Sequence, residues 1–174
     1  MRGRPFKSDV RKNIESILAT IGMGHGYQIF KIYKQAYDKA TLRNIYYHLQ
    51  TGVRLREFIE AGSEETDGRY TWGPKAEIKL YALGPNASQT ADPKVQDAMK
   101  ALSIRQKNPD KSIAWNELAK ETWELFLKDM EKAKTQTDMK KQMEEYGRIR
   151  AWLGKHDDPA EREKVEKKLS TFSQ

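Results

Sequence analysis

The stretch Thr41-Leu-Arg-Asn-Ile-Tyr-Tyr-His-Leu-Gln-Thr-Gly52 decides the fold of the first half of the chain. Its apolar residues are spaced i, i+3, i+4 and i+7, which places them on one face of an α-helix. They are Leu42, Ile45, Tyr46 and Leu49. Thr41 is a favourable N-cap and glycine commonly ends helices, so the stretch predicts a helix that ends at Gly52 and has one apolar and one polar face.

Two further helices are predicted before this one. The first follows a capping serine, Ser8, and its apolar residues also recur at helical spacing. They are Val10, Ile14, Ile17, Leu18 and Ile21. The second helix is predicted over about residues 27–37. Gly22 and Gly24 separate the two, so residues 22–26 predict a turn.

A β-hairpin is predicted after the three helices. Polar and apolar residues alternate in two segments, Arg69-Tyr-Thr-Trp72 and Glu77-Ile-Lys-Leu-Tyr-Ala-Leu83. Gly73-Pro74 lies between them and favours a turn. Residues 53–61 are also capable of forming a strand. Three helices followed by a hairpin is the winged-helix order, in which the third helix is the recognition helix and the hairpin is the wing.

The second half of the chain predicts helices only. Residues 84–91 have the composition of a linker, and helices are expected to open at Asp92-Pro93, Ser112, Asp138 and Asp158-Pro159. The predicted organisation is a basic tail over 1–7, a winged-helix domain over 8–83, the linker, and a helical domain over 92–174. The predicted fold class is therefore α+β, mostly α.

Positive charge is concentrated in the first half of the chain. Residues 1–91 hold 14 Lys and Arg against 9 Asp and Glu, whereas residues 92–174 hold 18 against 16. A basic patch on one module indicates a polyanionic partner such as nucleic acid. The alternative is a generic basic surface without a partner.

The chain lacks the residue sets of common catalytic and metal sites. It has no cysteine, and His25, His48 and His156 lie too far apart in sequence for metal-ligand spacing. The glycine-rich stretch 22–26 lacks the lysine of a phosphate-binding loop. We therefore expect no enzyme activity, no metal and no cofactor. No apolar run is long enough for a membrane span, so a cytoplasmic protein with no membrane partner is expected.

Candidate nucleic-acid contacts lie in three segments, which are the third helix, the wing and the N-terminal tail. On or beside the wing, Arg69, Lys75 and Lys79 would reach the flanking backbone. In the third helix, Arg43 suits guanine and Asn44 suits adenine, while Tyr47 would bond a phosphate or pack on a sugar. The segment Arg2-Gly3-Arg4-Pro5 looks like the core of an AT-hook, which enters a narrow minor groove. It would serve equally well as an arm that binds phosphate or RNA without sequence preference. The alternative for the third helix is an ordinary solvated face. The predicted site residues are Arg2, Arg4, Lys7, Arg11, Lys12, Lys39, Arg43, Asn44, Tyr47, His48, Arg69 and Lys75.

Large aromatic residues in the second half suggest a homodimer. Such residues are enriched in the cores of protein interfaces. The alternative is that they fill the core of an intramolecular helical bundle. The residues are Trp115, Trp123, Phe126, Tyr146 and Trp152.

The segment His25-Gly-Tyr-Gln-Ile-Phe-Lys-Ile32, with Asn44-Ile-Tyr-Tyr-His-Leu49 and Gly52-Val53, resembles the PadR-like winged-helix regulators. That family has a His-Gly-Tyr-x-Ile opening to its second helix and a Tyr-x-x-Leu pattern in its recognition helix. The resemblance covers about residues 8–83. It implies a dimeric transcription regulator whose C-terminal helices dimerise and sometimes hold a ligand. The basic tail is not a hallmark of the family, and the C-terminal half matches none of its motifs.

These observations predict a nucleic-acid-binding winged-helix protein. The favoured function is a dimeric, PadR-like transcription regulator that binds double-stranded DNA. The alternative is an archaeal ribosome- or rRNA-binding factor, for example a ribosome dimerisation or hibernation factor. Such a factor would use the winged helix and the basic tail to dock on ribosomal RNA.

Overall fold

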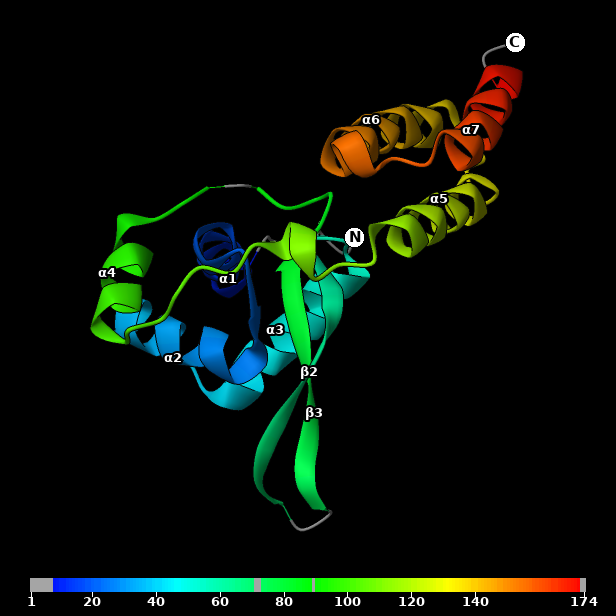
Figure 1. Cartoon of the computed structure of the whole chain (residues 1–174). Helices are drawn as coiled ribbons and strands as arrows, with labels where there is room; N and C mark the ends of the chain where they lie inside the picture. The colour runs from blue at the N-terminus through cyan, green and yellow to red at the C-terminus, as the bar shows by residue number, and fades with distance from the viewer. Residues whose placement is uncertain (1–7, 71–72, 89, 173–174) are drawn as a thin grey trace. The chain divides into compact units, whose positions relative to one another are not determined.

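The computed structural model of the chain describes residues 8–70, 73–88 and 90–172. These residues form a mostly helical α+β structure with one small antiparallel sheet of three strands (Figure 1). They divide into two compact units, with the boundary between Ser112 and Ile113. We call the part up to Ser112 unit 1 and the part from Ile113 unit 2.

Unit 1 combines α-helices with the sheet. Its helices are α1 (Asp9–Ile21), α2 (Gly26–Tyr37), α3 (Leu42–Arg54) and α4 (Pro93–Ala101). Its strands are β1 (Met23–His25), β2 (Phe58–Tyr70) and β3 (Gly73–Leu83), and a 3-10 turn, η1, spans Pro109–Lys111. Ser8 is the N-cap residue of α1, but its side chain makes no capping hydrogen bond. The three helices predicted before residue 55 are therefore present.

Helix α3 does not end at Gly52 as predicted but continues to Arg54. A Cβ atom on Gly52 would lie 2.1 Å from Cδ2 of Phe58. Glycine at this position therefore allows the ring of Phe58 to pack against the helix backbone. Its role is close packing inside the helix, not termination of the helix.

The sheet has the order β1-β3-β2, and both pairings are antiparallel. Met23 pairs with Ala82 and His25 pairs with Leu80, so the prediction of a simple turn over residues 22–26 was wrong. Gly22, with φ of 79°, ends α1 and leads the chain into this three-residue strand. A strand this short carries no alternating pattern that could distinguish it from a turn.

The hairpin of β2 and β3 is longer than predicted, and Figure 1 shows it extending beyond the helices of unit 1. Gly73 pairs with Tyr70, so Gly73 and Pro74 begin β3 and do not form the predicted turn. The outer part of β2 reads Ser63-Glu-Glu-Thr-Asp67. Because it has no apolar residue at every second position, the sequence did not indicate a strand there.

The core of unit 1 is built from α1, α2, α3, the inner ends of β2 and β3, and α4. Its residues are Ile14, Ile17, Leu18, Ile21, Ile29, Ile32, Tyr33, Ile45, Leu49, Phe58, Tyr81, Val95 and Ala98. Four residues were predicted to form the apolar face of the third helix. Of these, Ile45 and Leu49 are fully buried and Tyr46 is partly buried. Leu42 is exposed, contrary to the prediction.

Helix α4 belongs to unit 1, whereas residues 92–174 were predicted to form one helical domain. Asp92 caps α4 by accepting from the backbone N–H of Lys94, and it also accepts from the hydroxyl of Tyr37 in α2 at 2.8 Å. Glu15 in α1 accepts from the backbone N–H of Ser88 at 3.2 Å. The segment expected as a linker over 84–91 is therefore bonded across the helices of unit 1.

Unit 2 contains α5 (Trp115–Met130), α6 (Gln136–Leu153), a 3-10 turn η2 (Gly154–His156) and α7 (Pro159–Phe172). Thr135 and Asp138 form a capping box at the start of α6, so Asp138 supports the helix from inside instead of opening it. Helix α5 begins at Trp115 after Ala114, and not after Ser112 as predicted. No strand lies after residue 92 in the described part of the chain, as expected.

No helix within residues 8–70, 73–88 and 90–172 is both long enough and apolar enough to span a membrane.

Candidate nucleic-acid interface

Helix α3 presents a continuous exposed stripe opposite its buried face. The side chain of Thr41 accepts from the backbone N–H of Asn44 at 3.2 Å and so starts the helix. Ile45 and Leu49 are fully buried. Residues spaced by four, three and four positions lie on the other side and are exposed. This α3 stripe consists of Arg43, Tyr47, Gln50 and Arg54.

Close contacts hold α3 against the rest of unit 1. A Cβ atom on Gly26 would lie 2.4 Å from Cε1 of Tyr46, so the start of α2 packs directly on the ring. Phe58 packs on Gly52 in the same way at the other end of the helix. With contacts at both ends, the α3 stripe is presented by a rigid element.

Tyr47 is the most exposed of the large apolar and aromatic side chains in the described residues, at 60%. Its ring makes an edge-to-face contact with His48 at 5.1 Å between centroids. His48 itself is half-buried, and burial, followed by the charge of Arg11, lowers its pKa. A neutral, half-buried His48 is a poor phosphate ligand. Asn44 is half-buried at the edge of the stripe.

Arg11 does not belong to the interface, in contrast to the prediction. Its Nε donates to Oε2 of Glu57 at 2.8 Å, and both side chains are less than one-tenth exposed. This ion pair joins α1 to the residue before β2. The guanidinium is used inside the fold, because a buried charge must be paired.

Exposed positive charge on the helices before β2 exceeds exposed negative charge. Between residues 8 and 56, the exposed charged side chains comprise six basic and two acidic residues. The basic ones are Lys12, Lys31, Lys34, Lys39, Arg43 and Arg54, and the acidic ones are Asp9 and Asp38. The predicted contacts Lys12 and Lys39 are among them.

Sequence reasoning missed Tyr27 as a surface residue. Its side chain is 47% exposed. The ammonium of Lys31, one turn later, lies 5.0 Å from the centroid of its ring. The signal was the pair of an aromatic and a basic residue at i and i+4, which face each other on a helix.

The hairpin carries its own counter-charges. Lys75 pairs with Glu65 at 3.0 Å, and Lys79 pairs with Glu60 at 2.9 Å. Within the exposed hairpin the lysines are therefore matched by carboxylates, and Lys75 is a weaker candidate for phosphate contact than predicted. Nothing is described for the side chain of Arg69, and Arg2, Arg4 and Lys7 lie outside the described residues.

The aromatic residues expected at a dimer interface form the core of unit 2 instead. Trp123 and Phe126 are fully buried, and the indole N–H of Trp123 donates to Asp157 at 2.8 Å. Trp115, Tyr146 and Trp152 are partly buried against the same core. Trp123 and Phe126 are buried within one chain and so cannot form the predicted interface, whereas the homodimer and the part of Trp115, Tyr146 and Trp152 in it stay predictions.

His25 gives unit 1 a pH-dependent cap. Its Nδ1 accepts from the backbone N–H of Gln28 at 3.2 Å, which only an unprotonated nitrogen can do. Burial lowers the pKa of His25, and Lys107 and Lys31 add to this while Glu64 opposes it. The pKa of His25 is lower in the folded state than in the unfolded state. The cap therefore stabilises the fold fully when the pH is above the pKa of the unfolded state, and this stabilisation is lost as the pH falls through the pKa of the folded state.

We therefore expect unit 1 to lose stability between pH 8 and pH 5 partly through His25. In His25→Asn the cap is kept but does not titrate, so the variant should lose less stability over this range than the wild type. His25→Ala should cost about 1 kcal/mol already at pH 8. Hydrogen exchange of α2 amides against pH measures both effects. Equal pH profiles for wild type and His25→Asn would contradict the assignment.

Comparison with family models, with curated proteins and with solved structures finds no match to this chain.

Proposed function

We propose that unit 1 is a winged-helix nucleic-acid-binding module and that α3 is its recognition helix. The main support is the α3 stripe, whose basic, aromatic and amide side chains are exposed on a helix with a fully buried opposite face. Arginine and glutamine are the side chains that pair with guanine and adenine edges in a major groove. The element order, with a β-hairpin after α3, agrees with this fold.

Duplex DNA is the first candidate target. A helix with two arginines near its ends and a tyrosine and a glutamine between them matches the mixture of base and backbone contacts made by recognition helices. The cellular role proposed with this target is a PadR-like transcription regulator. This role rests on the sequence resemblance, including the His25-Gly26-Tyr27 start of α2.

Ribosomal RNA is the second candidate, and two observations favour it. Lys75 and Lys79 on the hairpin are paired with acidic neighbours, so the wing offers little to a DNA backbone. Tyr27 and Tyr47 are exposed beside basic residues. Exposed aromatic rings stack on unpaired bases, which RNA loops present and duplex DNA does not.

Two variants measured on two targets test the proposal. Arg43→Ala should weaken binding to duplex DNA by about 1–3 kcal/mol if α3 reads base edges. Deletion of residues 1–7 should weaken binding to all DNA sequences and lower the salt slope by up to about three, since it removes Arg2, Arg4 and Lys7. In the RNA alternative, the deletion abolishes binding to small ribosomal subunits and Arg43→Ala has a small effect. If neither variant changes binding to either target, the proposed interface is wrong.

Binding should depend steeply on salt. If all six exposed basic residues of the helical region contact phosphates, affinity should fall about 10³-fold between 50 and 200 mM salt, because each contact releases condensed counterions. Fluorescence anisotropy with labelled duplex DNA and labelled rRNA fragments measures the slope. An affinity that stays constant over this range would exclude an electrostatic interface.

A further inference from the structure

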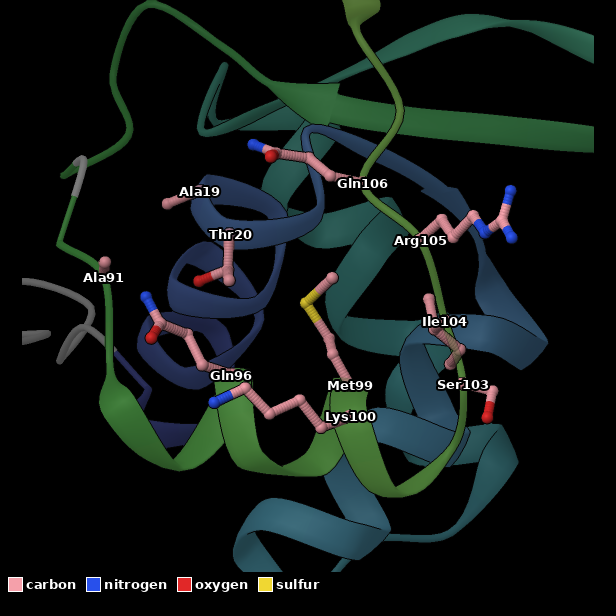
Figure 2. A pocket seen from close by; sticks show the side chains of 10 residues that line it. All are labelled: Ala19, Thr20, Ala91, Gln96, Met99, Lys100, Ser103, Ile104, Arg105 and Gln106. Carbon is pink, nitrogen blue, oxygen red and sulfur yellow. The ribbon is translucent and has the colours of Figure 1, made fainter.

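A pocket of about 620 Å³ lies in unit 1 between the end of α1 and α4 (Figure 2). Its volume is in the range of pockets that hold small organic molecules. None of its lining residues belongs to α2 or α3. The pocket is therefore separate from the α3 stripe.

A fixed turn after α4 forms one wall of the pocket. Ser103 has φ of 52°, which is uncommon for a residue other than glycine. The backbone N–H of Ile104 donates to the carbonyl of Met99 at 2.9 Å, and that of Lys107 donates to the carbonyl of Ile21 at 2.8 Å. These bonds return the chain along the end of α1, so the wall has a defined shape.

The pocket has an apolar floor and polar groups at one side. Met99 and Ile104 pack on the core of unit 1 and also line the pocket. In Figure 2, Met99 stands in the middle of the labelled side chains, with Thr20, Gln96 and Lys100 on one side of it. Gln96 and Lys100 are one turn apart on α4 and so share a face.

The lining is positively charged. It includes Lys100 and Arg105 and no Asp or Glu, and neither cation forms an ion pair within the described residues. The guanidinium of Arg105 points away from Met99 in Figure 2, whereas Lys100 lies beside Gln96. Lys100 is therefore the cation that would contact a ligand directly. Arg105 would contribute only long-range electrostatic attraction.

We propose that this pocket binds a small organic anion with an apolar body, such as a medium-chain carboxylate. The carboxylate pairs with Lys100 and accepts from the amide of Gln96, and the apolar body covers Met99 and Ile104. A neutral apolar molecule would leave the lysine unused. An inorganic anion would leave the floor uncovered.

The test is a titration of the full chain, labelled with ¹⁵N, with three probes: octanoate, octanol and inorganic phosphate. Octanoate should shift the amide resonances of Thr20, Met99 and Lys100, and it should bind at least tenfold more tightly than either other probe. Lys100→Met should weaken octanoate binding at least tenfold. Lys100→Arg should keep it, and Arg105→Met should change it less than threefold.

Lys100 lies in the last turn of α4, where a cation also stabilises the helix. Lys100→Arg retains that role, and unchanged α4 amide resonances in Lys100→Met show that the variant is folded. Octanol or phosphate binding as tightly as octanoate, or Lys100→Met binding as the wild type does, would overturn the proposal. The double variant Arg43→Ala, Arg54→Ala should bind octanoate as the wild type does. The two proposals can therefore fail separately, because octanoate binding does not depend on the α3 stripe.

Discussion

Replacing Glu57 with alanine is expected to destabilise unit 1 by about 3–5 kcal/mol, because it leaves Arg11 buried without a partner. The two side chains are 8% and 9% exposed, and Nε of Arg11 lies 2.8 Å from Oε2 of Glu57. The lost attraction is only part of the cost. The larger part is the desolvation of a buried guanidinium that has lost its carboxylate partner.

Hydrogen exchange of α1 and α3 amides measures this loss in unit 1 alone. The matched control is Glu65→Ala, which breaks the exposed pair with Lys75 and should cost less than about 1 kcal/mol. The double variant Arg11→Met, Glu57→Met removes both charges and should recover most of the stability. Equal effects of Glu57→Ala and Glu65→Ala would show that burial does not decide the strength of this pair.

The helices were predictable from sequence because each has a local signal. An apolar stripe at helical spacing identified α3, and the order Asp92-Pro93 identified the start of α4. The long hairpin was not predictable. The outer part of β2 is exposed and rich in acidic residues, so its pairing with β3 leaves no trace in hydropathy.

The unit boundary depended on long-range contacts that sequence does not show. Gly84 to Ala91 has the composition of a linker, yet Ser88 is bonded to Glu15 and Asp92 to Tyr37. Both bonds join residues more than fifty positions apart. The same limit explains Arg11, whose partner Glu57 lies in a different segment and turned a predicted phosphate contact into an internal one.

The aromatic residues of unit 2 show how composition leaves interface and core undecided. Trp123 and Phe126 have the size and polarity of interface anchors, but α6 and α7 bury them completely within one chain. The sequence correctly indicated that they would be buried. Whether they are buried within one chain or between two chains depends on the tertiary structure, which the sequence pattern does not show.

Removing both ends of the α3 stripe, in Arg43→Ala, Arg54→Ala, is expected to weaken binding to duplex DNA by at least about 2 kcal/mol, or roughly 30-fold. The two residues are eleven positions apart, which is about 16 Å along a helix, so their contributions should add. Fluorescence anisotropy at fixed salt measures the loss.

The matched control for this variant removes the same amount of positive charge from the hairpin. In Lys75→Ala, Lys79→Ala the net charge falls by two as well, but both lysines are already neutralised by Glu65 and Glu60. The affinity for the nucleic acid should therefore change less than about threefold, which corresponds to the small free energy of an exposed ion pair. Equal losses in the two double variants would mean that overall charge attracts the nucleic acid and that α3 has no special role. A larger loss of affinity in the hairpin variant would identify the hairpin as the docking element, because Lys75 and Lys79 would then be the residues that contact the nucleic acid.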